Sequence, residues 1–175
     1  MRKVLSVLAS MTLLAGAFAI SAQRPRQSPH ETVSSMVGGK RITIVYGRPF
    51  AKGRDVWAAP IAPAGKVWRA GADEATLLAL QGDIMLGSLH VPAGAYTLFV
   101  ITGETEWTLI VNKMVGQWGL TYNEQMDLGR VKMAVAKAAA PVEQLTIGIS
   151  GVEGNKATLK IAWAEREASI PVMMH

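Results

Sequence analysis

Residues 144–149, Gln-Leu-Thr-Ile-Gly-Ile, place an apolar side chain at every second position, and residues 158–163, Thr-Leu-Lys-Ile-Ala-Trp, repeat the pattern. A period of two puts all the apolar side chains of an extended segment on one face. The other face carries residues that water tolerates, as in an antiparallel sheet packed on one side. Residues 42–46, 107–112 and 131–135 alternate in the same way. The sequence therefore predicts an all-β protein.

The number and spacing of the runs refine this prediction. Further β-compatible runs, separated by turn-forming residues, occupy residues 76–80, 84–86 and 96–102. About eight or nine short strands at this spacing predict an antiparallel β-sandwich or a jelly-roll-like barrel. Residues 134–140 favour helix by composition, but the alternation before them and Pro141 after them predict a strand that ends at the proline. A short helical turn is expected at residues 123–127.

The N-terminus has the layout of a secretory signal peptide. Arg2 and Lys3 precede an uncharged, apolar run over residues 4–20, and small residues follow it. The run lies at the short end of what spans a bilayer, so we expect cleavage and no stable membrane anchor. Ala17-Phe18-Ala19 fits the small-x-small rule best, whereas a cut after Ala22 removes the whole apolar run. We adopt the second boundary, which predicts a periplasmic or secreted protein.

Removal of residues 1–22 leaves residues 23–29 as a Pro- and Arg-bearing linker and residues 30–175 as a single β domain. The chain contains no cysteine, which excludes disulfides, thiol catalysis and thiolate metal sites. Loss of Arg2 and Lys3 lowers the formal net charge from +5 to +3. The remaining basic residues are scattered, so the sequence gives no support for nucleic-acid binding.

A family resemblance rests on six segments, in order along the chain: residues 28–33, 44–49, 52–54, 67–76, 92–98 and 106–112. These segments make the chain similar to DUF2911, a family of exported bacterial proteins known only as a domain of unknown function. The resemblance implies export and a mostly β fold. It supplies no activity and no catalytic residues.

Two stretches without strong periodicity, residues 47–71 and 113–129, are long connections of the kind that often carry function. At the end of the first, Arg69, Asp73 and Glu74 surround Gly71, which permits a tight reversal. Two interpretations are open for these charges: one wall of a polar cleft, or a salt bridge that braces the loop. The neighbouring Trp68 is either a core anchor or a platform for stacking.

Other residues could join this segment. Tyr46 and Arg48 end a strand, and Arg48 is either the partner of Arg69 in anion recognition or a solvated arginine at the sheet rim. Lys52 and Arg54 either contribute to the same field or belong to a solvated turn.

A second group lies elsewhere in the chain. Trp118 and Tyr122 resemble a surface that stacks on sugar rings, with a buried loop anchor as the alternative. Asp127 and Arg130 are expected to form a local ion pair.

His30 precedes Glu31 in the only adjacent pair of a histidine and a carboxylate. Neighbouring residues on a strand point to opposite faces, so these two side chains are expected to diverge. A metal site built from His30, His90 and a distant carboxylate lacks any recognised ligand spacing, and we assign no metal and no cofactor. No nucleophile elbow or phosphate loop is present in the sequence.

The sequence thus predicts a non-catalytic envelope module that binds a small polar or anionic ligand, or a glycan, in a loop-lined cleft. The expected ligand-binding residues are His30, Tyr46, Arg48, Trp68, Arg69, Asp73, Glu74, Trp118 and Tyr122. One alternative is a hydrolase or isomerase that uses His30 with Asp73 or Glu74, with or without a metal. Another is a structural or protein-interaction domain. The catalytic residues and the oligomeric state stay open.

Overall fold

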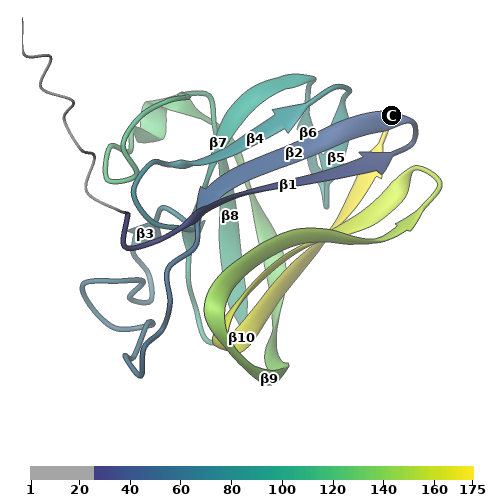
Figure 1. Ribbon diagram of the computed structural model, residues 1–175. Coiled ribbons are helices and arrows are strands. Elements are labelled where there is room, and N and C mark those ends of the chain that lie inside the picture. Colours follow the sequence, from purple (N-terminus) through teal and green to yellow (C-terminus); the bar gives the residue numbers. More distant parts are fainter. Residues whose placement is uncertain (1–25) are drawn as a thin grey trace, which may run out of the picture.

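The computed structural model describes residues 26–175, which form one antiparallel sheet (Figure 1). Its ten strands are β1 His30–Val37, β2 Lys40–Gly47, β3 Val67–Trp68, β4 Thr76–Leu80, β5 Ile84–Leu86, β6 Leu89–Val91, β7 Gly94–Ile101, β8 Glu106–Asn112, β9 Asp127–Glu153 and β10 Lys156–Met174. A single 3-10 turn, η1 Glu124–Met126, is the only helical element of this described part. The predicted all-β class and the predicted turn are confirmed, although the strands number ten.

The predicted leader, residues 1–22, lies outside the described residues. Within residues 26–175, no helix has the length and apolar character needed to cross a membrane.

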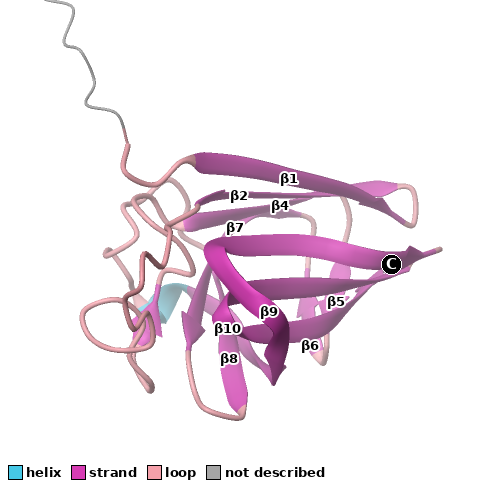
Figure 2. Cartoon of the chain, turned by 60° about the horizontal axis from the view of Figure 1, so that its bottom comes forward, coloured by secondary structure: helices cyan, strands magenta, loops and turns pink. Residues whose placement is uncertain are grey.

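The sheet rolls around a single core. Its strand order is β1-β2-β4-β7-β8-β9-β10-β5-β6, and β3 pairs with β7 beside this path. The two ends of the order, β1 and β6, both lie against β9. Figure 2 shows how β9 and β10 curve across the molecule. The rolled sheet agrees with the predicted sandwich or barrel.

Two bulges in β9, each of several residues, produce this curvature. Thr146 and Val142 of β9 pair with Ala162 and Ala164 of β10, so residues 143–145 face a single residue of the partner strand. A second bulge follows at residues 138–141, and Ala164 takes a left-handed conformation with φ 48° between the two. Extra residues in one strand bend the pair and increase its twist.

The bulges correct one sequence prediction. The alternating segments 131–135 and 144–149 belong to one strand of 27 residues instead of two separate strands. Pro141 does not end the strand, because it lies in a bulge where the ladder needs no N–H donor.

The residues bulged out of β9 pair with the chain that leaves β2. Leu145 N donates to Pro49 O at 2.9 Å, and Ala51 N donates to Glu143 O at 2.7 Å. Ile147 N donates to the hydroxyl of Tyr46 at 2.8 Å. The unpaired backbone groups of the bulge are therefore satisfied, and β2 is fastened to the far half of β9.

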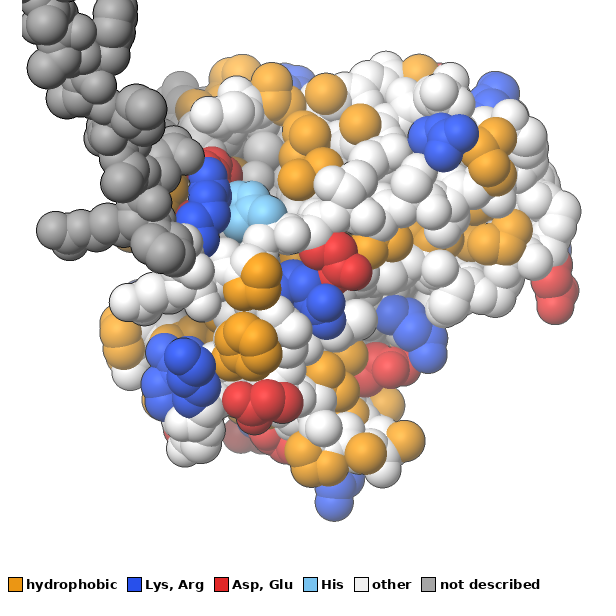
Figure 3. All heavy atoms as spheres, in the orientation of Figure 1, with side chains coloured by type: hydrophobic (Ala, Val, Ile, Leu, Met, Phe, Trp, Pro, Cys, Tyr) orange, Lys and Arg blue, Asp and Glu red, His pale blue; other side chains and the backbone are white. Residues whose placement is uncertain are grey.

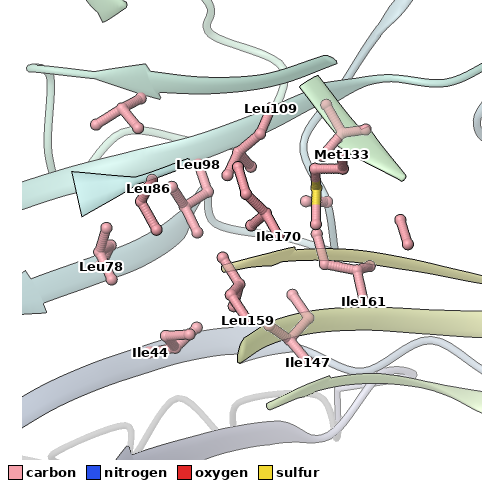
Figure 4. Close-up of a cluster of buried hydrophobic side chains, with 14 of the residues drawn as sticks. Ile44, Leu78, Leu86, Leu98, Leu109, Met133, Ile147, Leu159, Ile161 and Ile170 are labelled. Carbon is pink, nitrogen blue, oxygen red and sulfur yellow. The ribbon is translucent and has the colours of Figure 1, made fainter. Parts of the chain in front are cut away.

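Leucine, isoleucine and methionine side chains fill the space between the two halves of the rolled sheet (Figure 4). Four of the five tryptophans close one end of this core: Trp57, Trp68, Trp107 and Trp163. Trp68 is only 4% exposed and stacks on Trp163 with ring centroids 5.8 Å apart. Trp68 is therefore a core anchor, one of the two roles left open by the sequence.

Glycine substitutions at two alanines of β10 test the bend. Ala164→Gly relieves a left-handed alanine, which offsets the lost methyl group and the added freedom of the unfolded chain, so we expect the free energy of unfolding to change by less than about 0.5 kcal/mol. Ala162 has no such conformation, and Ala162→Gly is expected to lower that free energy by about 1–2 kcal/mol. Urea unfolding of both variants measures the difference. Equal losses would contradict the role given to Ala164.

Candidate functional site

The loop between β3 and β4 is held rigidly by its own backbone. Ala70 and Asp73 adopt left-handed conformations with φ 50° and 64°. The hydroxyl of Thr76 donates to Ala70 O at 3.0 Å, and Ala72 N donates to Gly47 O at 3.2 Å. A Cβ atom at Gly47 would collide with the carbonyl of Ala72, so this close crossing of two backbones requires the glycine.

The left-handed Asp73 allows two adjacent carboxylates to approach one histidine. His30, the first residue of β1, places its Nε2 3.1 Å from Glu74 Oε2 and 3.8 Å from Asp73 Oδ2. Arg26 completes the cluster, because its Nη1 lies 2.7 Å from His30 Nε2 and 2.5 Å from Glu74 Oε2. Figure 3 shows basic, acidic and histidine side chains side by side on this face.

Arg26 is the basic partner of the cluster. Its guanidinium only donates hydrogen bonds, and its Nη1 lies within hydrogen-bonding distance of both His30 Nε2 and the Glu74 carboxylate. The paired hydrogen bonds from Arg26 lower the pKa of Glu74 to about 2. Glu74 is thus ionised well below neutral pH.

A cleft of about 680 Å³ lies beside this cluster. Its walls come from both irregular connections of the chain, and Asp73 belongs to the cleft as well as to the cluster. Among the predicted site residues, the cleft contains Trp68, Arg69, Asp73 and Tyr122.

Basic side chains dominate the charge of the cleft. Lys52, Arg54, Lys66 and Arg69 line it, against Asp73 as its single carboxylate. None of these four cations forms an ion pair with a carboxylate within residues 26–175. Arg54 and Arg69 donate only to backbone carbonyls. The cleft therefore presents a positive field that the described chain does not neutralise.

Arg48 and Tyr46 lie outside the cleft, so Arg48 does not join Arg69 there, which was one of the two roles left open for it. Arg48 Nη1 is 2.8 Å from Glu31 Oε2, and its Nε donates to Leu145 O at 2.9 Å. Burial raises the pKa of Tyr46 to about 12, and its hydroxyl lies 3.1 Å from the Glu31 carboxylate. These side chains fasten β2 to β9 and do not line the cleft.

Glu31 and His30 diverge as the alternation of β1 predicted. His30 faces Glu74, whereas Glu31 faces Tyr46 and Arg48. His90 takes no part in this cluster, because it lies 3.3 Å from Asp83 and against His175.

Trp118 and Tyr122 have different roles. Trp118 is 49% exposed, does not line the cleft and forms a backbone bridge with Glu74. The ring of Tyr122 lines the cleft and packs against Phe99, with centroids 5.0 Å apart. Its hydroxyl donates to Asp127 at 2.8 Å, and Asp127 forms the predicted ion pair with Arg130 at 2.9 Å. The Tyr122 hydroxyl is thus part of a local hydrogen-bond network.

The model of a protein family described as "Protein of unknown function (DUF2911)" matches residues 28–172. The chain belongs to the DUF2911 family. This confirms the resemblance seen in the sequence. Searches of curated proteins and of solved structures found no match for this DUF2911 chain.

Sequence reasoning about this DUF2911 protein missed two participants. Arg26 falls in the predicted linker and was given no role, and only its contacts with His30 and Glu74 reveal one. Lys66 lies two residues before Trp68 and was not singled out. A signal for Lys66 was available, because it belongs to the same irregular connection as Lys52, Arg54 and Arg69.

Replacing Arg26 tests the electrostatics of the cluster. In Arg26→Ala we expect the pKa of Glu74 to rise from about 2 toward its ordinary value near 4.5, because the paired hydrogen bonds are lost. A depressed folded-state pKa stabilises the protein above about pH 4.5, and this contribution disappears as the pH falls toward 2. Titration of the Glu74 side-chain carboxyl by NMR measures the shift.

Arg41→Ala is the matched control, because Arg41 donates to Ser34 and not to a carboxylate. An unchanged Glu74 titration in Arg26→Ala would contradict the assigned pairing.

Proposed function

We propose that this protein is an exported, non-catalytic module that binds a small anionic ligand in the cleft. The excess of cations carries the proposal: four basic side chains and one carboxylate line a cleft of about 680 Å³. Its size lies within the range of small-molecule sites. Guanidinium and ammonium groups without carboxylate partners are available for charge-assisted hydrogen bonds to a carboxylate or phosphate.

The remaining walls of the cleft favour a ligand with a ring or other flat body. Aromatic rings contribute to the lining at Phe50, Trp68, Phe99, Tyr122 and Trp163. A ligand that combines an anionic group with a ring would match both features of the cleft.

The cellular location in this proposal rests on the sequence. Arg2, Lys3 and the apolar run over residues 4–20 form the expected export signal.

Matched charged and neutral ligands test the proposal. Glucuronate and benzoate are the anionic probes, glucose is the neutral counterpart of glucuronate, and tryptophan fluorescence reports binding because Trp68 and Trp163 line the cleft. We expect an anionic probe to bind and glucose not to bind. The double variant Lys66→Ala/Arg69→Ala should weaken binding about tenfold or more, since each lost charge-assisted hydrogen bond contributes about 1.5–3 kcal/mol.

Asp73→Asn should change the affinity for anions in the opposite direction. Removing the single carboxylate of the cleft should strengthen anion binding by about two- to tenfold, and asparagine tolerates the left-handed backbone at this position. Lys137→Ala is the control, because Lys137 is exposed and lies outside the cleft. If glucose binds as tightly as the anionic probes, or if Asp73→Asn binds the anion more weakly, the proposal of an anionic ligand fails and a neutral glycan takes its place.

Catalysis by His30 with Asp73 or Glu74 is the second candidate function. The position of Glu74 within hydrogen-bonding range of His30, at 3.1 Å, and of Asp73 at 3.8 Å favours it. Arg26 opposes it, because its guanidinium contacts both His30 Nε2 and the Glu74 carboxylate and favours the ionised form of Glu74. If Arg26→Ala and the unmodified protein both leave a panel of ester, amide and sugar substrates unchanged, this candidate fails.

A further inference from the structure

The cluster of His30, Asp73 and Glu74 is already a cation site, because the described chain inserts its own cation there. The two carboxylates offer acceptors, His30 contributes one ring nitrogen, and Arg26 supplies donors. A guanidinium brings one positive charge to two carboxylates. The cluster therefore keeps an excess of negative charge that a divalent ion would balance.

The separations suit a metal ion. One ligand atom from each of the three residues lies within 4.8 Å of the other two. A transition-metal ion holds nitrogen and oxygen ligands at about 2.0–2.2 Å, so two ligands of one ion lie at most roughly 4.4 Å apart. His30 Nε2 meets this limit with both carboxylates, at 3.1 and 3.8 Å. Only a small movement of the two carboxylates toward each other is needed.

The three side chains are held on rigid elements. His30 starts β1, where Arg48 N donates to Pro29 O at 2.8 Å. The loop with the two carboxylates is fastened on its other side, where Gly119 N donates to Asp73 O at 2.9 Å. A preformed set of ligands lowers the cost of ordering them around an ion.

Arg26, by contrast, can leave. It precedes the anchored Pro29, and the hydrogen bonds of its guanidinium go only to His30 and Glu74 within the described chain. Its bidentate pair with Glu74 is exposed, at 49% and 42% of the two side chains, so solvent and salt screen it and water can replace its hydrogen bonds. We propose that His30, Asp73 and Glu74 form a binding site for a divalent transition-metal ion, and that Arg26 is a displaceable internal cation that competes for it.

One imidazole with two carboxylates suits Zn²⁺ or Mn²⁺ better than Ca²⁺, which prefers oxygen ligands alone. Isothermal titration calorimetry with Zn²⁺ at pH 7.5, in a phosphate-free buffer without any cleft ligand, tests the site. We expect one ion per chain, and a loss of affinity of at least about tenfold in His30→Ala and in Glu74→Gln, since each removes a ligand of the ion. Arg26→Ala should bind Zn²⁺ about three- to tenfold more tightly, because the competing charge is gone.

His90→Ala is the matched control, because His90 and Asp83 form another histidine–carboxylate pair, at 3.3 Å. Its Zn²⁺ affinity should equal that of the unmodified protein. Unchanged affinity in His30→Ala, or a loss in His90→Ala, would overturn the site. Unchanged affinity in Arg26→Ala would overturn the competition between Arg26 and the metal ion. If Glu74→Gln fails to fold, Arg26→Ala still tests the site. Lys66→Ala/Arg69→Ala should retain Zn²⁺ binding, which separates the metal site from the proposed anion cleft.

Discussion

Seven residues of β9 lie in two bulges, and between the bulges β9 pairs with a left-handed alanine of β10. The bulges allow the β9–β10 hairpin to belong to both halves of the sheet. The rest of the molecule depends on this bend. It brings residues 143–145 against the exit of β2, where their backbone groups find new partners at Pro49 and Ala51. The chain leaving that junction becomes the irregular connection that lines the cleft. A straight hairpin would leave both the core and the cleft open on this side.

The cleft and the neighbouring cluster have opposite charge and share Asp73. Charged groups this close affect each other, because a carboxylate that neutralises a cation in one region is less available to a cation in the other region. The chain separates the two regions by keeping the lysines and arginines of the cleft away from Glu74, whose partner is Arg26. Asp73 is therefore the residue through which occupancy of one region would affect the other.

The period of two along the chain was enough to predict the all-β class, the divergence of His30 from Glu31, and most of the strands. It could not predict that residues 131–135 and 144–149 share one strand, because bulges depend on what the released residues pair with. The approach of His30 to Glu74 was equally hidden. It depends on the left-handed backbone of Asp73 and on the crossing at Gly47, neither of which leaves a periodic signal. Two roles stayed open for Arg48, because its contacts with Glu31 of β1 and Leu145 of β9 depend on how distant strands pack together.

The β9–β10 hairpin also has a consequence for the order of folding. Its turn is only two residues long, so its strands meet at little cost in loop-closure entropy. β8 and β5, by contrast, pair with it across longer stretches of chain. Rates of folding fall as the sequence separation of contacts grows. The β1–β2 and β5–β6 hairpins have two-residue turns as well, so we expect all three hairpins to form before β5 pairs with β10 across a long stretch of the chain.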